Sequence, residues 1–199
     1  MKLTWYGHSC FKLDCEDGSI VLDPYKKDSV PGLMLPKLQA NLVLCSHEHD
    51  DHSGKECVEI VGDSTKLNVE KISTFHDNQQ GNLRGKNIVH IVNTEGMRIV
   101  HLGDIGCMFD VSKIINCDVL MIPVGGYYTI DARQALDLIE RIQPRIVIPM
   151  HYRTDAFGYD VTSTIDEFIS NVKNCIEYDT NEIEVGKETS AHIAILRCK

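Results

Sequence analysis

The sequence predicts a layered α/β fold, on three observations. Five apolar runs of strand length each end in a ligand-type residue or a diglycine. Amphipathic stretches of helical length alternate with these runs, a pattern typical of a sheet covered by helices. The composition, 43% hydrophobic and 25% charged residues, is close to that of soluble globular proteins. No linker or repeat divides the chain, so we expect one domain over residues 1–199.

The N-terminal third predicts short strands at Lys2–Tyr6, Cys10–Cys15 and Ser19–Asp23, where β-branched and aromatic residues dominate. A turn at 16–18 joins the second strand to the third. These strands should form an antiparallel meander. Pro24–Pro36 contains three prolines and a glycine and therefore predicts a loop.

Three stretches have helical periodicity. The clearest is Asp131–Ile142, in which Asp131 and Gln134 have the spacing of a capping box. Ser53–Val61 and Ser163–Val172 are the other two. We expect these helices to cover the sheet.

The five apolar runs deliver particular side chains to one edge. They are 41–47, 69–76, 98–104, 119–126 and 145–151. In layered α/β proteins, ligands bind where strands end in loops. The runs should therefore bring His47, His76, Asp104 and His151 together, although each of the last three, taken singly, could equally have a structural role.

The first run ends in the densest polar cluster of the chain. Three imidazoles and three carboxylates occupy positions 47–52. A divalent cation such as Zn²⁺ recruits both ligand types. Alternate residues of an extended loop point the same way, so His47 and His49 can share one ion while Asp51 and His52 turn toward a second. The alternative is a solvated polar loop.

These residues resemble a known signature. His47-x-His49-x-Asp51-His52 resembles the H-x-H-x-D-H motif of the metallo-β-lactamase superfamily, and His76, Gly103-Asp104 and His151 follow in that family's order. Gly7-His8-Ser9, Ile20–Pro24, Pro123–Gly126 and Ile148–Tyr152 look like the small metal-dependent hydrolase branch that includes L-ascorbate-6-phosphate lactonase. The resemblance implies an α/β, four-layer αββα sandwich, with two mixed sheets flanked by helices.

The resemblance also implies roles for the ligands. The first metal would be held by His47, His49 and His76, the second by Asp51, His52 and His151, with Asp104 between them and Asp23 supporting the histidine loop. Two zinc ions suit these ligands, and Mn or Fe also fit. Flavodiiron oxygen reductases of the superfamily are expected to have glutamate at the position of His49, so the resemblance favours hydrolysis over redox chemistry.

Two ions can supply a metal-bound hydroxide at neutral pH, and Asp51 would orient it and accept its proton. The sequence thus predicts a dinuclear hydrolase acting on an ester, lactone or phosphoester of a small anionic molecule. The alternatives are a phosphodiesterase or nuclease of the same fold, or a non-catalytic metal-binding or sensory protein.

Candidate substrate contacts are Gly125, Gly126, Tyr127, Arg153 and His8. The diglycine offers backbone N–H groups, and Arg153 offers a fork for an anion. A tight turn explains the diglycine equally well, a surface ion pair is the commoner fate of such an arginine, and His8 could instead be a core histidine.

Charge and composition limit the partners. Twenty Lys and Arg against twenty-nine Asp and Glu give a net charge of −9, which disfavours nucleic acid as a partner. The start lacks a signal-peptide pattern and no apolar run reaches the roughly 18 residues of a membrane span, so we expect a cytoplasmic protein without membrane attachment. Eight cysteines without a C-x-x-C motif predict reduced thiols. A homo-oligomer is compatible with the sequence.

Overall fold

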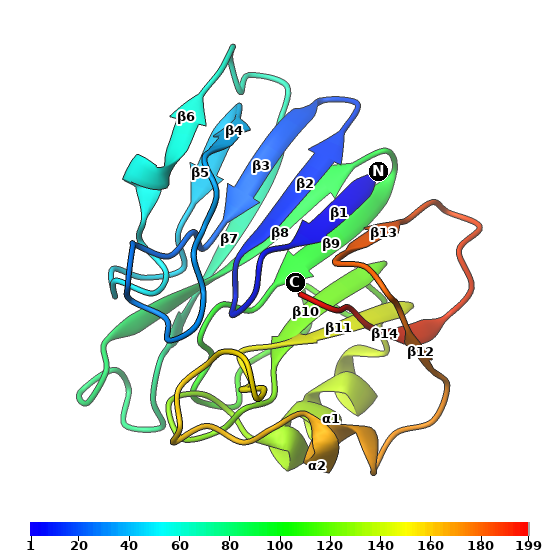
Figure 1. The fold of residues 1–199 in the computed structure, drawn as a ribbon. Coiled ribbons are helices and arrows are strands. Elements are labelled where there is room, and N and C mark those ends of the chain that lie inside the picture. Colours follow the sequence, from blue (N-terminus) through cyan, green and yellow to red (C-terminus); the bar gives the residue numbers. More distant parts are fainter. Residues whose placement is uncertain (199) are drawn as a thin grey trace.

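The computed structural model describes residues 1–198 and contains two mixed β-sheets packed face to face (Figure 1). The N-terminal sheet has the strand order β13-β1-β2-β3-β5. Its strands are β1 (Lys2–Trp5), β2 (Phe11–Cys15), β3 (Gly18–Leu22), β5 (Leu42–Leu44) and β13 (Glu182–Glu184). β1, β2 and β3 pair antiparallel, as the meander prediction requires, and β5 joins β3 in parallel.

The second sheet has the order β12-β14-β11-β10-β9-β8-β7. Its strands are β7 (Asn68–Phe75), β8 (Lys86–Thr94), β9 (Met97–His101), β10 (Val119–Pro123), β11 (Ile146–Met150), β12 (Cys175–Glu177) and β14 (His192–Ile195). β7, β8 and β9 pair antiparallel in succession, whereas β9, β10, β11, β14 and β12 are parallel. Consequently β7, β9, β10 and β11 all run in one direction and end at one edge.

The core lies between the two sheets. In β1 and β2, Leu3, Trp5, Phe11 and Leu13 are buried, and they belong to one apolar cluster with residues of the second sheet such as Ile99. Alternate residues of a strand face opposite sides, so only one face of the N-terminal sheet enters this core. All five residues of β10 and of β11 are buried, because helices cover the other face of their sheet.

Helix α1 (Ala132–Ile142) provides most of that cover, with α2 (Asp166–Ile169) beside it (Figure 1). The predicted capping box at its start is present. The Gln134 backbone N–H donates to Asp131 Oδ1 at 2.8 Å, and the Asp131 backbone N–H donates to Gln134 Oε1 at 3.2 Å. The sandwich architecture and this helix are therefore confirmed.

The helix predicted over Ser53–Val61 is wrong. The chain forms a 3₁₀ turn at Lys55–Cys57 and then strand β6 (Val58–Ile60), which pairs in parallel with β4 (Leu38–Ala40). The Gly54 N–H donates to the Pro24 carbonyl at 2.6 Å and Val58 packs in a second apolar cluster, so tertiary contacts override the helical periodicity. The β4–β6 pair and the 24–36 loop cover the outer face of the N-terminal sheet on this side.

The helix predicted over Ser163–Val172 is shorter than expected, because only Asp166–Ile169 is α-helical. The Ser163 N–H donates to the Gly125 carbonyl and Thr164 forms a β-bridge with Arg153, so the start of the segment is not helical. At its end, the Ser170 hydroxyl and the Asn171 amide donate to the Glu167 carbonyl and compete with the helical hydrogen bonds. Within residues 1–198, no helix has both the length and the apolar character needed to cross a membrane.

Candidate metal centre

The strand ends meet at one edge of the sandwich, as the sequence predicts. The loops after β1, β5, β7, β9 and β11 bring their histidines and aspartates into three overlapping groups, within each of which the ligand atoms lie within 4.8 Å of one another. The groups are His47, His49 and His76; His47, His52 and Asp104; and His8, Asp51, His52 and His151. All seven residues predicted as metal ligands belong to them.

Asp104 lies at the centre of this cluster. Its Oδ2 atom is 3.1 Å from His151 Nε2, 3.2 Å from His52 Nε2 and 3.5 Å from His76 Nε2. One carboxylate therefore contacts imidazoles assigned to both predicted ions. Asp104 is buried, and its backbone N–H donates to Asn87 Oδ1 at 2.9 Å, which anchors the turn after β9.

His8, expected to contact substrate, is instead a buried neighbour of the ligands. Its Nε2 is 3.1 Å from Asp51 Oδ2, and its ring centroid lies 4.0 Å from that of His151. The bend that turns it inward has positive φ at Gly7 (88°) and His8 (50°). Only 2% of His8 is exposed, so it can orient Asp51 but has little surface to offer a substrate.

Asp23 lies behind the histidine loop. Its Oδ2 accepts hydrogen bonds from His52 Nδ1 at 2.8 Å and from the Ser46 hydroxyl at 2.6 Å, while its Oδ1 accepts the Ser46 backbone N–H at 2.6 Å. Ser46 Oγ in turn lies 2.9 Å from His47 Nδ1. One buried carboxylate thus orients two of the imidazoles through their Nδ1 sides and leaves both Nε2 atoms facing the cluster.

The protonation states match a cation site. Burial lowers the pKa of His47 to about 3 and that of His76 to about 4, so both imidazoles are neutral at pH 7. Burial opposes ionisation of Asp51 and Asp104, but the surrounding imidazoles outweigh it and hold the pKa of both carboxyls below the usual range. Burial also opposes the charge on His52, yet Asp104 and Asp51 raise its pKa.

Several buried polar atoms have no hydrogen-bond partner among residues 1–198. Four of them face the centre: His47 Nε2, His52 Nε2, His151 Nε2 and Asp104 Oδ1. An unsatisfied buried polar atom is costly, and such atoms are rare in folded proteins. Divalent cations would satisfy these atoms, His52 Nε2 after loss of its proton, and imidazole with carboxylate is a donor set that zinc accepts. The residues present therefore fit a metal centre.

A cavity of about 250 Å³ opens above the centre. Its lining includes the predicted ligands His49, Asp51, His76 and Asp104, together with Arg84, Tyr128 and Tyr159, which we did not predict. Arg84 is in the loop after His76, Tyr128 follows the diglycine, and Tyr159 is eight residues beyond His151. Their proximity in sequence to predicted site residues was the available signal.

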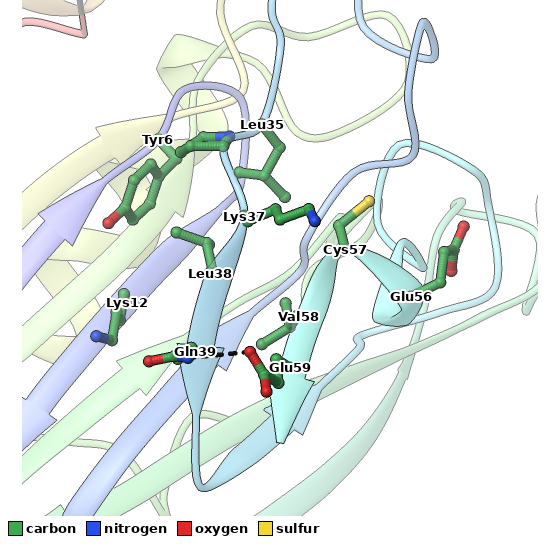
Figure 2. A pocket seen from close by; sticks show the side chains of 11 residues that line it. Tyr6, Lys12, Leu35, Lys37, Leu38, Gln39, Glu56, Cys57, Val58 and Glu59 are labelled. Carbon is green, nitrogen blue, oxygen red and sulfur yellow. Dashed lines mark hydrogen bonds between the residues drawn. The ribbon is translucent and has the colours of Figure 1, made fainter. Parts of the chain in front are cut away.

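A larger hollow of about 870 Å³ lies elsewhere, beside the β4–β6 pair (Figure 2). Tyr6, Leu38 and Val58 line it, and Gln39 Nε2 donates across the pair to Glu59 Oε2 at 2.9 Å. None of the predicted metal ligands lines this hollow. The smaller cavity, by contrast, is bordered by four of them.

The remaining predicted substrate contacts, Gly125, Gly126, Tyr127 and Arg153, do not line the cavity above the predicted metal centre. Arg153 Nε donates to the Thr162 carbonyl at 2.9 Å, and Tyr127 is 63% exposed. The Gly126 N–H donates to the Ile130 carbonyl within the turn after β10. A side chain at Gly125 would collide with the His151 carbonyl, so this glycine allows the two strand ends to approach.

Known proteins share this fold and motif set. Residues 2–151 match the family model described as the beta-lactamase superfamily domain. A UPF0173 protein of Pyrococcus abyssi is 30% identical over 186 residues, covering 79% of this chain and 86% of that protein. A UPF0173 metal-dependent hydrolase of Natranaerobius thermophilus is 27% identical over 188 residues, with coverages of 77% and 84%.

Among solved structures, this chain resembles a Thermotoga maritima protein described as a Zn-dependent hydrolase of the metallo-beta-lactamase superfamily. The TM-score is 0.76 at 27% identity, and the match covers 98% of this chain and 97% of that one. The narrower likeness to L-ascorbate-6-phosphate lactonase stays a prediction. The family match spans most of the chain and includes every predicted ligand. The protein therefore belongs to the family described as the beta-lactamase superfamily domain.

Proposed function

We propose that this metal-dependent hydrolase uses two divalent ions to cleave an ester, lactone or phosphoester bond in a small anionic substrate. The position of Asp104 carries the proposal. Its Oδ2 lies within 3.5 Å of His76 on one side and of His52 and His151 on the other, so that a single carboxylate can bridge two ions.

His47, His49 and His76 would hold one ion, and Asp51, His52 and His151 would hold the other. Zinc suits this donor set, and Mn or Fe also fit it. When bound, such a pair supplies Lewis acidity and lowers the pKa of water toward neutrality.

The protein's own groups orient the reaction. Asp51 borders the cavity, and His8, at 3.1 Å from Oδ2, limits the freedom of its carboxylate. Asp51 can therefore hold an attacking water in line and accept its proton. The hydrogen bond from His52 Nδ1 to Asp23 fixes the tautomer that leaves Nε2 available for a metal.

Metal content and hydrolysis test the proposal together. Protein purified without chelator and resupplied with Zn or Mn should contain about two equivalents per chain by mass spectrometry. Asp104→Ala and His49→Ala should lose metal and nearly all hydrolysis while keeping their far-UV circular dichroism. Asp137→Ala, which removes an exposed carboxylate from α1, is the matched control.

The screen should include 4-nitrophenyl esters, lactones and bis-4-nitrophenyl phosphate. One equivalent of metal would contradict the dinuclear proposal. Two equivalents without turnover of any of the three classes would contradict the proposed reaction and leave only a metal-binding protein.

A further inference from the structure

We propose that Arg84 recognises the acidic group of the substrate and that Asp77 positions the loop that presents it. The identity of the cleaved bond rests on the proposed function, whereas the binding of the acidic group to Arg84 does not. Recognition by Arg84 narrows the substrate class to a small ester, lactone or phosphoester that carries a second, uncleaved carboxylate or phosphate.

Arg84 belongs to an aromatic wall of the cavity. Its guanidinium carbon lies 5.6 Å from the centroid of the Tyr128 ring. The Tyr159 ring packs edge-on against Tyr128, with centroids 5.7 Å apart and an interplanar angle of 70°. The Tyr159 hydroxyl donates to the Ser29 carbonyl at 2.7 Å, and this bond fixes the Tyr159 ring. Cation–π contact holds the guanidinium in place without neutralising it.

Arg84 has no ion-pair partner within the part of the chain that the structure describes. No carboxylate lies within 4.0 Å of its guanidinium among residues 1–198, although the side chain is half-buried. Arg145 shows the usual alternative: it pairs with Asp118 at 2.8 Å and donates to the Thr189 carbonyl. A guanidinium that borders a cavity and lacks an ion-pair partner remains available for a ligand.

Asp77 organises the loop that carries Arg84. Its carboxylate is buried and accepts four backbone N–H groups in one turn of chain: Gln79 at 2.7 Å, Gly81 at 2.9 Å, Leu83 at 3.0 Å and Arg84 at 2.7 Å. One of these bonds ends on Arg84 itself.

The same loop is joined to the metal centre. The His76 N–H donates to the Gly85 carbonyl at 3.1 Å, and the Gly85 N–H donates to the Gly81 carbonyl at 3.0 Å. These two hydrogen bonds close residues 76–85 into a loop that begins at His76 and contains Arg84. The closed loop holds Arg84 at a constant distance from His76, as recognition of a substrate at two points requires.

Charge and size define the ligand. Two divalent ions with the carboxylates of Asp51 and Asp104 leave the loaded centre cationic, and Arg84 adds a further positive charge. The planar fork of a guanidinium matches the paired oxygens of a carboxylate or phosphate. A cavity of about 250 Å³ is smaller than most drug-sized sites, so the ligand is a small molecule.

Binding of non-hydrolysable anions to the metal-loaded protein tests Arg84 without turnover. Phenylphosphonate and benzoate are titrated calorimetrically into wild type, Arg84→Gln, Arg84→Lys and the exposed-site control Arg133→Gln. The metals contribute equally in every protein, so differences in Kd report the guanidinium. The probe that binds more tightly to wild type distinguishes a phosphate from a carboxylate ligand.

Arg84→Gln should raise the Kd of the preferred probe about tenfold, at the lower end for a lost hydrogen bond to a charged group because the side chain is partly exposed. Arg84→Lys should lie between Arg84→Gln and wild type, since it keeps the charge but not the fork. Arg133→Gln should match wild type. Arg84→Gln within twofold of wild type for both probes, or no binding of either probe to wild type, would overturn the assignment.

Kinetics separate this inference from the proposed function. If ester hydrolysis is observed, the ratio of kcat/KM for mono-4-nitrophenyl glutarate to that for 4-nitrophenyl pentanoate should fall about tenfold in Arg84→Gln. Turnover with an unchanged ratio would refute the role of Arg84 alone. Bound metal without turnover would refute the proposed reaction, while the calorimetric comparison on the metal-loaded protein would still report on Arg84.

Asp77→Asn tests the positioning role. The amides of Gln79, Gly81, Leu83 and Arg84 should lose protection from hydrogen exchange, and the Kd of the preferred probe should rise several-fold, in line with the loss of charge-assisted bonds. Because Asp77 follows His76, metal content is measured on the same sample and should stay at the wild-type value. Loss of protection with an unchanged Kd would refute the positioning role.

Discussion

Asp23 and His52, both fully buried, are joined by a hydrogen bond of 2.8 Å from His52 Nδ1 to Asp23 Oδ2. The same carboxylate holds Ser46, which contacts His47. Two imidazoles of the predicted metal centre are therefore oriented from one point at the end of β3.

Asp23→Asn should weaken metal binding about 10- to 100-fold, the range observed when the partner behind a ligating histidine is removed. The amide keeps the shape of the carboxylate but loses the charge that fixes the His52 tautomer. Competition with a fluorescent chelator measures the affinity, with the surface variant Asp137→Asn as the control. An Asp23→Asn variant with wild-type affinity would show that the orientation of His52 does not depend on this carboxylate.

Metal binding at pH 7 should release about one proton, which comes from His52. Asp104 and Asp51 raise the pKa of His52 in the metal-free protein, so its Nε2 is protonated there and must lose that proton on ligation. The release should diminish as the pH rises through this elevated pKa. Calorimetry in buffers of different ionisation enthalpy counts the protons, and a buffer-independent binding enthalpy at pH 7 would contradict the assigned state.

Gly125→Ala should destabilise the protein by about 1–3 kcal/mol, because the new methyl group would collide with the carbonyl of His151. The shift of β11 should also lower metal affinity. Gly186→Ala is the matched control, since no atom lies within 4 Å of the methyl group it would add. Urea denaturation of both variants measures the difference, and equal midpoints would show that the two strand ends are not held in close contact.

Arg153→Gln should leave the Kd of phenylphosphonate and benzoate within about twofold of wild type, because its guanidinium donates to the Thr162 carbonyl and does not line the cavity. Its stability should fall by about 0.5–1.5 kcal/mol for the lost hydrogen bond. The same calorimetric titration that tests Arg84 measures the affinity. A tenfold weakening in Arg153→Gln would return this residue to the binding site.

Local sequence patterns predicted the elements that are stabilised by interactions between residues close together in the sequence. The capping box of Asp131 and Gln134 specifies the start of α1, and the β-branched and aromatic residues near the N-terminus indicate the meander. The same kind of reasoning misassigned Ser53–Val61, because this segment obtains its conformation from a partner strand. Val58 of β6 pairs with Leu38 of β4.

The sequence by itself determined the ligand types, their order and the edge at which they meet, because strands of one direction end at one side of a sheet. Only the tertiary structure decided which polar groups face the cavity. The cavity-lining residues Arg84, Tyr128 and Tyr159 come from three separate loops. His8 instead contacts Asp51, and Arg153 donates to the Thr162 carbonyl. Loop direction depends on hydrogen bonds between distant segments, such as those of Asp77, which no local periodicity encodes.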